Sequence, residues 1–253
     1  MNYSYEDIAG MIDHSLLHPT LTDRELEEGC RLAARYKVAS VCIKPYAVRR
    51  AAEWLKGSGV AVGAVVGFPH GGSATEVKRF ETGVACRDGA TEIDMVINVG
   101  KALSGDWDYV EQDVKAVCDE AHAQGAIVKV IFENDFLPDD AIKIRLCEVC
   151  ERAGADFVKT STGYGFVKRP DGAYSYQGAT EHDLKLMRAH CSDKVQVKAA
   201  GGVRDLDALI KVRALGATRC GASATAALLD ELRRRTEAGA PTSSGGTLGG
   251  GGY

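Results

Sequence analysis

Short apolar segments rich in Val, Ile and Ala alternate with longer amphipathic segments along most of the chain. The short segments predict strands, because they are rich in β-branched residues and bounded by turn-forming residues. They span residues 11–15, 39–43, 60–67, 92–98, 126–132, 156–160, 195–199 and 218–221. Strands that are apolar on both faces are typical of a parallel sheet covered on both sides.

The longer segments predict helices, because apolar side chains recur in them at helical spacing. They span residues 23–36, 73–87, 106–124, 138–152, 180–189, 205–215 and 223–235. Thr22 stands where the first of these needs an N-cap. Gly125, Gly154 and Gly216 each follow a predicted helix, where glycine favours termination. Gly-Ala followed by Thr or Asp begins at Gly89, Gly154 and Gly216, each time between a predicted helix and a strand, which predicts repeated βα units.

Eight strands that alternate with helices predict an α/β fold, a single closed (β/α)8 TIM barrel, and 253 residues suit one such domain. An open doubly wound sheet is the alternative, but it favours a G-x-G-x-x-G after the first strand, which is absent there. We expect the barrel over residues 1–237. Residues 238–253 contain seven glycines without a hydrophobic period, which predicts a flexible tail.

Composition narrows the functional classes. The net charge is −4 and the pI about 5.9, which argues against the basic surface of a nucleic-acid-binding protein. No apolar run approaches 18 residues, so we expect no membrane span. There is no apolar leader segment, and the eight scattered cysteines are typical of reduced thiols. We therefore expect a cytoplasmic protein.

Single charged residues interrupt four successive apolar strands: Asp94, Lys129, Lys159 and Lys198. A buried charge costs several kcal/mol unless it is paired. One aspartate among three lysines leaves surplus positive charge, which favours one neutral amine. A neutral amine is what a lysine nucleophile requires.

The expected repulsion is large enough to matter. Neighbouring strands lie about 4.8 Å apart, so the amines of Lys159 and Lys198 are expected to approach within roughly 6 Å. At an effective dielectric near 20 they repel by about 3 kcal/mol, or about two pKa units. Burial lowers a lysine pKa further. The charge pattern leaves open which lysine is neutral.

Glycine-rich segments follow the sixth, seventh and eighth predicted strands. Phosphate sites in such barrels form from the last loops, where backbone N–H groups approach the phosphate oxygens. We therefore predict a phosphate site there. The candidate residues are Thr162, Gly163, Gly201, Gly202, Arg204, Gly221 and Ser223.

Two of these segments resemble a known family. Lys159-Thr-Ser-Thr-Gly, followed 39 positions later by Lys198-Ala-Ala-Gly-Gly-Val-Arg204, is similar to the deoxyribose-phosphate aldolases. The resemblance covers roughly residues 8–235. Further matching segments are Ile-Asp13-His14, Val-Cys42-Ile-Lys-Pro45, Gly67-Phe-Pro69-His-Gly71 and Glu-Ile-Asp94-Met-Val-Ile-Asn.

The resemblance implies a class I aldolase that reversibly cleaves 2-deoxy-D-ribose 5-phosphate to glyceraldehyde 3-phosphate and acetaldehyde, in deoxyribonucleoside catabolism. It implies that Lys159 forms the imine, Lys198 lowers its pKa and Asp94 relays protons. The iminium is the electron sink, so neither metal nor cofactor is expected. We expect Asp13, Cys42 and Lys129 to line the substrate site, and the chain to form a homodimer or homotetramer.

Some positions depart from the family pattern. Tyr164 stands where many members carry a lysine that contacts phosphate, and Ala224 stands where a serine is frequent. The segment 166–176 is longer than usual. These departures bear on phosphate affinity more than on the reaction. Some members end in a tyrosine that assists proton transfer, so Tyr253 is a further catalytic candidate.

Other functional classes stay open. They are a Schiff-base barrel aldolase for another phosphosugar, a sugar-phosphate isomerase that forms no imine, and a barrel that only binds a sugar phosphate. The cluster of strand lysines disfavours the last, because binding alone needs no neutral amine.

Overall fold

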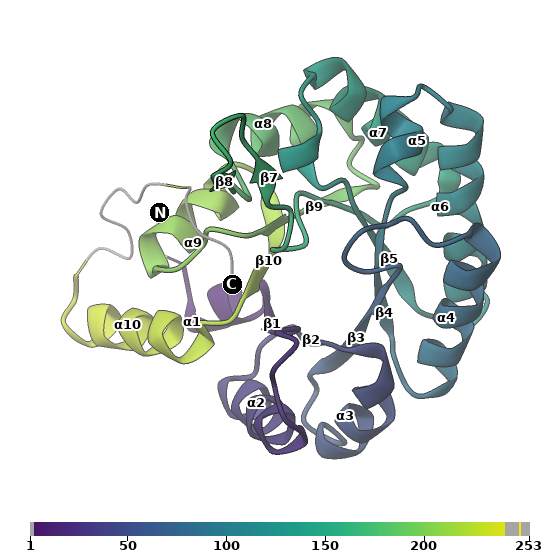
Figure 1. Ribbon diagram of the computed structural model, residues 1–253. Helices are drawn as coiled ribbons and strands as arrows, with labels where there is room; N and C mark the ends of the chain where they lie inside the picture. Colours follow the sequence, from purple (N-terminus) through teal and green to yellow (C-terminus); the bar gives the residue numbers. More distant parts are fainter. Residues whose placement is uncertain (1–2, 241–247, 249–253) are drawn as a thin grey trace.

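A closed barrel of eight parallel strands forms the centre of the molecule (Figure 1). The computed structural model describes residues 3–240 and 248. Around the barrel the strand order is β1-β10-β9-β6-β5-β4-β3-β2. The strands are β1 (Ile12–Leu16), β2 (Ser40–Ile43), β3 (Ala61–Val66), β4 (Glu92–Val96), β5 (Ile127–Ile131), β6 (Phe157–Lys159), β9 (Gln196–Ala200) and β10 (Ala217–Ala222). The predicted TIM barrel is thus confirmed.

Helices surround the barrel, as Figure 1 shows. They are α1 (Tyr5–Ala9), α2 (Asp23–Tyr36), α3 (Val48–Trp54), α4 (Thr75–Arg87), α5 (Val99–Leu103), α6 (Trp107–His122), α7 (Asp140–Ala153), α8 (Glu181–His190), α9 (Leu206–Ala214) and α10 (Thr225–Glu237), with short 3-10 helices η1 (Pro45–Ala47) and η2 (Asn134–Phe136). All seven predicted helices are present. The pattern missed α1, α3 and α5, because five to seven residues show too little periodicity.

Local sequence sets the ends of these helices. Thr22 caps α2 by accepting the Glu25 N–H, and the Glu25 side chain accepts the Thr22 N–H in return. Gly154 ends α7 in the left-handed conformation, with φ of 87°, which carries no steric cost for glycine. Thr22 thus sets where α2 begins after β1, and Gly154 sets where α7 ends before β6.

A small hairpin, β7 (Val167–Lys168) and β8 (Tyr174–Ser175), is inserted between β6 and α8. The sequence predicted only a long loop there. Both strands are two residues long, too short to show an alternating pattern.

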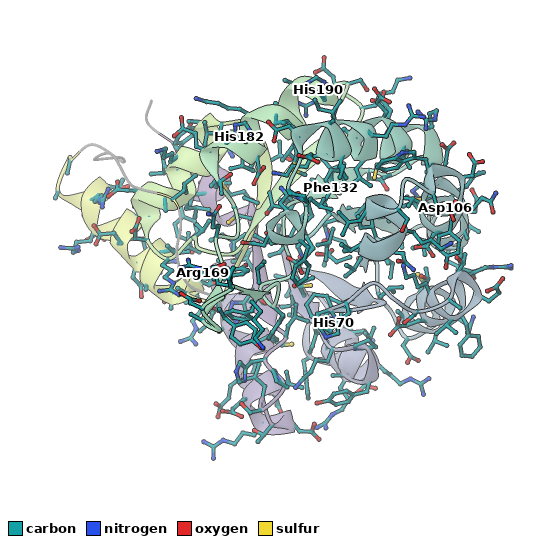
Figure 2. The ribbon with its side chains drawn as sticks, turned by 45° about the horizontal axis from the view of Figure 1, so that its top comes forward. His70, Asp106, Phe132, Arg169, His182 and His190 are labelled. Atoms are coloured by element: carbon teal, nitrogen blue, oxygen red, sulfur yellow. The ribbon has the colours of Figure 1, made fainter. Side chains whose placement is uncertain are left out.

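The apolar core lies between the barrel and its helices. Phe132, just after β5, is fully buried near the centre of the molecule, whereas Asp106 and His190 lie at its edge (Figure 2). Leu248 packs against this core, but Tyr253 and most of the predicted tail lie outside the described residues. All eight cysteines are free thiols. No helix in the described ranges combines the length and apolar composition of a membrane span.

Candidate active site

Strand register places the predicted charged residues side by side inside the barrel. Lys159 of β6 pairs with Lys198 of β9, and Asp94 of β4 pairs with Lys129 of β5. Partners in a parallel ladder point to the same face, so each pair shares the interior. All four side chains are at most 4% exposed.

Asp94 stands at the centre of this group. Its Oδ1 accepts a hydrogen bond from Lys129 Nζ at 2.8 Å. Its Oδ2 accepts hydrogen bonds from both Lys159 Nζ and Lys198 Nζ, each at 2.7 Å. The amines of Lys159 and Lys198 are therefore no more than twice that distance apart. One carboxylate serves three lysines.

Three further charged side chains extend this group along the barrel. Asp13 of β1 lies 2.5 Å from Lys198 Nζ, and Glu92 of β4 lies 2.7 Å from Lys129 Nζ. Arg219 of β10 bridges these two carboxylates, with Nε 2.7 Å from Asp13 Oδ1 and a guanidinium N–H 2.7 Å from Glu92 Oε2. The sequence had indicated Asp13 but neither Glu92 nor Arg219.

The complete group, here called the barrel charge cluster, holds three carboxylates and four cationic side chains. Its members are Asp13, Glu92, Asp94, Lys129, Lys159, Lys198 and Arg219. The expectation of one aspartate among three lysines was therefore too simple, because it implied a surplus of two positive charges, whereas the cluster has a surplus of one. A neutral lysine would balance the cluster.

The contacts favour Lys159 as that lysine. Lys198 has two carboxylate partners and Lys129 has three. Among the described contacts, Lys159 has one, an oxygen of Asp94 that Lys198 also uses. Burial, with the charge of Lys198, lowers the pKa of Lys159 despite the opposing effect of Asp94. Burial opposes a charge on Lys198 too, but Asp13 and Asp94 raise its pKa well above the usual value.

Neighbouring ammonium groups also act on Asp94. Burial disfavours its charge, yet Lys129, Lys159 and Lys198 together hold its pKa well below the usual range. Asp94 therefore stays a carboxylate at neutral pH. It can orient the two amines and pass on a proton, but it does not retain one.

An apolar wall adjoins the cluster. Cys42 of β2 packs with Leu17 and Val65, and Phe68 and Tyr164 cover them. The Cys42 thiol lies 3.9 Å from Asp94 Oδ2, and burial, followed by the charge of Asp94, raises its pKa to about 11. Tyr164 packs edge-on against Phe68 with ring centroids 5.7 Å apart. This wall can exclude water from the neighbourhood of Lys159.

Glu133 is a buried acid that sequence reasoning missed. It lies between β5 and η2 with φ of 60°, a left-handed conformation that is rare outside glycine. Its carboxylate accepts hydrogen bonds from the Thr162 N–H at 3.1 Å and from the Thr162 hydroxyl. Glu133 therefore fixes the loop that leaves Lys159. A Cβ added at Gly165 would lie only 2.7 Å from the Glu133 carboxyl carbon, so a side chain there would displace the Glu133 carboxylate.

The predicted phosphate residues lie at the C-terminal ends of three neighbouring strands, β6, β9 and β10. Thr162 is buried, whereas Arg204 and Ser223 are exposed. Gly163, Gly201 and Gly202 have φ of 97°, 85° and 76°. Gly221 on β10 faces Lys198, and a Cβ there would lie 3.7 Å from Lys198 Cε. The predicted residues therefore border one rim of the barrel.

The segment after Gly163 covers part of that rim. Tyr176 packs against Gly201 so closely that a Cβ at Gly201 would lie 1.9 Å from the Tyr176 hydroxyl oxygen. Lys168 and Arg169 are exposed on the hairpin, and Arg169 is visible in Figure 2.

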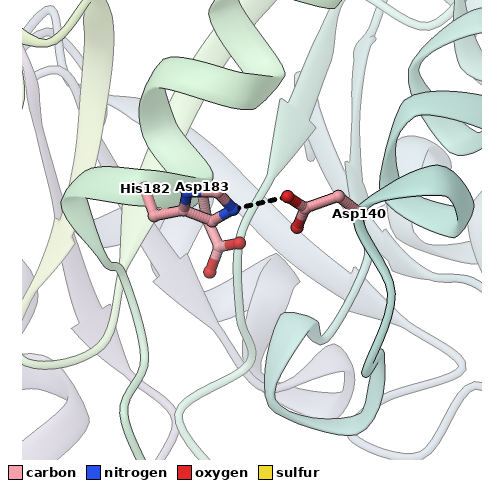
Figure 3. A group of neighbouring side chains, drawn as sticks. All are labelled: Asp140, His182 and Asp183. Carbon is pink, nitrogen blue, oxygen red and sulfur yellow. Dashed lines mark hydrogen bonds and ion pairs between the residues drawn. The ribbon is translucent and has the colours of Figure 1, made fainter.

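A separate group, Asp140, His182 and Asp183, has ligand atoms within 4.8 Å of one another, as a metal site requires (Figure 3). Lys143 Nζ already lies 2.6 Å from Asp183 Oδ1 and 3.7 Å from Asp140 Oδ1. The other Asp183 oxygen accepts the Thr180 hydroxyl at 2.9 Å. These interactions explain the group as a link between α7 and α8, and we assign it no metal.

Comparisons with known proteins agree with this geometry. Residues 8–232 match the family model of the DeoC/LacD family aldolases. The chain is 52% identical to a deoxyribose-phosphate aldolase of Rhodopirellula baltica, covering 92% of both chains. It is 46% identical to a deoxyribose-phosphate aldolase of Clostridium perfringens, covering 89% of this chain and 95% of the relative.

A solved structure shows the same fold. The tetrameric deoxyribose phosphate aldolase of Aeropyrum pernix superposes with a TM-score of 0.80 at 30% identity, covering 91% of this chain and 92% of that one. Family model, relatives and structure agree over nearly the full barrel. The chain belongs to the DeoC/LacD family of aldolases.

Proposed function

We propose that this protein is a class I aldolase that reversibly cleaves 2-deoxy-D-ribose 5-phosphate to D-glyceraldehyde 3-phosphate and acetaldehyde, in deoxyribonucleoside catabolism. The observation that carries the proposal is the shared carboxylate. Lys159 and Lys198 both contact Asp94 Oδ2 at 2.7 Å, and Lys159 is the one with no second carboxylate partner among the described contacts. A buried amine in this position is suited to nucleophilic attack.

These contacts support the following reaction. Neutral Lys159 attacks the aldehyde carbon of the open-chain sugar, and loss of water gives an iminium. The iminium withdraws the electron pair of the C2–C3 bond as that bond breaks. Asp94, through a water, takes the proton of the C3 hydroxyl and passes it on, because its own pKa is held low by the neighbouring lysines despite burial.

The second half returns the enzyme to its starting state. Glyceraldehyde 3-phosphate leaves, and the enamine on Lys159 takes up a proton at its terminal carbon. We assign that protonation to Tyr253, which lies outside the described residues. Hydrolysis of the new iminium releases acetaldehyde and free Lys159. The cationic Lys198, whose pKa is raised by Asp13 and Asp94 against the effect of burial, keeps the released amine neutral.

The far end of the substrate is assigned to the glycine-rich rim. Backbone N–H groups around Gly163, Gly201 and Gly202, with Ser223 and Arg204, are proposed to hold the phosphate. We further propose a cytoplasmic homodimer or homotetramer; the Aeropyrum pernix relative is a tetramer.

Borohydride trapping tests the reaction. The protein is incubated with 2-deoxyribose 5-phosphate, reduced, and the adduct is mapped by mass spectrometry, with fructose phosphates as matched controls. We expect an adduct on Lys159 with the deoxy sugar only. An adduct with fructose phosphates alone would indicate a different aldolase. Substrate turnover without any adduct would indicate an isomerase, and binding without turnover a non-catalytic barrel.

A further inference from the structure

Arg219 is the one guanidinium of the barrel charge cluster, and its strand register pairs it with Lys198. Its side chain is only 13% exposed, and its guanidinium contacts both oxygens of Glu92 at 2.7 and 3.0 Å. Its Nε lies 2.7 Å from Asp13 Oδ1, and it sits 6.0 Å from the centre of the Phe157 ring. Arg219 is therefore held rigidly as a cation inside the barrel.

Each carboxylate that Arg219 holds is also a partner of a lysine. Asp13 is shared with Lys198 and, at 3.7 Å, with Lys129, and Glu92 is shared with Lys129. Arg219 also pairs with Asp13 and Glu92, so these two carboxylates do not fully balance the charges of Lys129 and Lys198. Both lysines complete their ion pairing on Asp94. This leaves little of the Asp94 charge for Lys159.

We propose that Arg219 is a positioning residue for the imine-forming step: by holding Asp13 and Glu92, it makes Lys129 and Lys198 depend on Asp94, so that Lys159 is the group that gives up its proton. The proposal rests on the function proposed above, in which Lys159 is the nucleophile. Arg219 touches no reacting atom in this scheme and acts through charge.

Other titratable groups around Lys159 do not replace this effect. Asp94 from β4, Lys198 from β9 and Cys42 from β2 act on it directly, and Glu133 follows β5. Burial raises the pKa of Cys42 to about 11, so its thiol is neutral at neutral pH. Burial raises the pKa of Glu133 to about 7, and its titration is common to all variants compared below.

The test measures the protonation of Lys159 without the full reaction. Acetaldehyde and cyanoborohydride convert a neutral amine to its ethyl derivative: the amine adds to the carbonyl, water leaves, and hydride from cyanoborohydride reduces the iminium. The rate of Lys159 ethylation is followed by mass spectrometry against pH. The acid limb is the pH range in which this rate falls tenfold per unit.

The variants change the charge of the cluster in opposite directions. Arg219→Met removes the surplus cation, so we expect the acid limb to move up by about one pH unit, as for one charge removed from a buried cluster. Glu92→Gln removes a carboxylate, which increases the surplus positive charge, so the acid limb should move to lower pH. The double variant, Arg219→Met with Glu92→Gln, again has a surplus of one positive charge. Its acid limb should therefore lie close to that of wild type. Arg219→Lys keeps the charge and should stay near wild type, as should Arg24→Met, which removes an exposed cation.

The outcomes separate the two proposals. If Arg219→Met leaves the acid limb in place, or if the double variant fails to restore it, Arg219 is only a packing residue. Should Arg219→Met fail to fold, a downward shift in Glu92→Gln supports the proposal and an unmoved acid limb overturns it. If the wild-type protein forms no Lys159 adduct at any pH, the proposed function is wrong.

Discussion

Lys78 and Lys159 are both buried, but in different layers of this molecule. Lys78 of α4 lies outside the barrel and is fully buried. Its Nζ donates to Asp113 Oδ2 at 2.5 Å and to the Val96 carbonyl at 2.9 Å. Lys159 lies inside the barrel, where it contacts one oxygen of Asp94 and shares that oxygen with another cation.

The pKa of each lysine is lowered, in both cases mainly by burial. Burial alone therefore does not identify a nucleophile. The difference lies in the countercharge: the other oxygen of Asp113 accepts only the neutral Thr75 hydroxyl in the contacts described, whereas Asp94 serves three lysines. A lysine that has its own carboxylate holds helices together, and one that shares its carboxylate can lose its proton and react.

Replacing the proposed nucleophile, Lys159, should give the largest effect. Lys159→Met removes the amine, so we expect no trapped adduct and a fall in cleavage rate of at least about a thousandfold. Stability should hold or rise, because the variant removes the surplus cation of the cluster. A coupled assay for glyceraldehyde 3-phosphate and urea denaturation measure the two quantities. Residual cleavage within tenfold of wild type would show that another lysine forms the imine.

The same substitution at the structural lysine should have the opposite profile. Lys78→Met leaves Asp113 buried without its cation, which typically costs about 3–5 kcal/mol. Urea denaturation should show this loss, while Lys159 in the folded fraction reacts at the wild-type rate. The matched control is Lys78→Met with Asp113→Leu, which removes both charges and should recover most of the loss. A slower Lys159 reaction in folded Lys78→Met would contradict the view that Lys78 has only a structural role.

Removing Lys198 should leave Lys159 with a carboxylate oxygen of its own, as Lys78 has. In Lys198→Met, Oδ2 of Asp94 belongs to Lys159 alone and the repulsion from Lys198 is gone. Both changes raise the pKa of Lys159, so its neutral fraction at pH 7 falls. We expect imine formation to be up to about a hundredfold slower at pH 7, with most of the rate recovered about two pH units higher. An equal loss at pH 7 and pH 9 would contradict this explanation.

The sequence predicted the barrel because its strands and long helices repeat a strong pattern. It missed the short elements, such as α3 and the β7–β8 hairpin, which are held by tertiary contacts. Lys159, Lys198 and Asp94 stood out because each interrupts an apolar strand. Glu92 could have been found, because it precedes Asp94 by two residues and alternation places both on one face. Arg219 could not, because its partners Asp13 and Glu92 are far from it in sequence.

The buried acid Glu133 was also hidden, because no residue type signals a left-handed, buried glutamate. Glu133 is the acidic counterpart of the two lysines, a buried acid without a cationic partner among its described hydrogen bonds. Its predicted effect is the smallest. Its hydrogen-bond donors are the amide and hydroxyl of Thr162, both uncharged. Burial therefore dominates and raises its pKa to about 7, although these bonds oppose the shift.

A raised pKa means that the folded state favours protonated Glu133. Its contribution to stability is complete below the unfolded value of 4.5 and is lost as pH rises through about 7. Glu133→Gln mimics the protonated form and does not titrate. We expect wild type to lose about 1–2 kcal/mol more stability than this variant between pH 5 and pH 7 in urea denaturation. Equal losses would mean that Glu133 keeps its charge when buried, and that uncharged donors can replace a countercharge in this barrel.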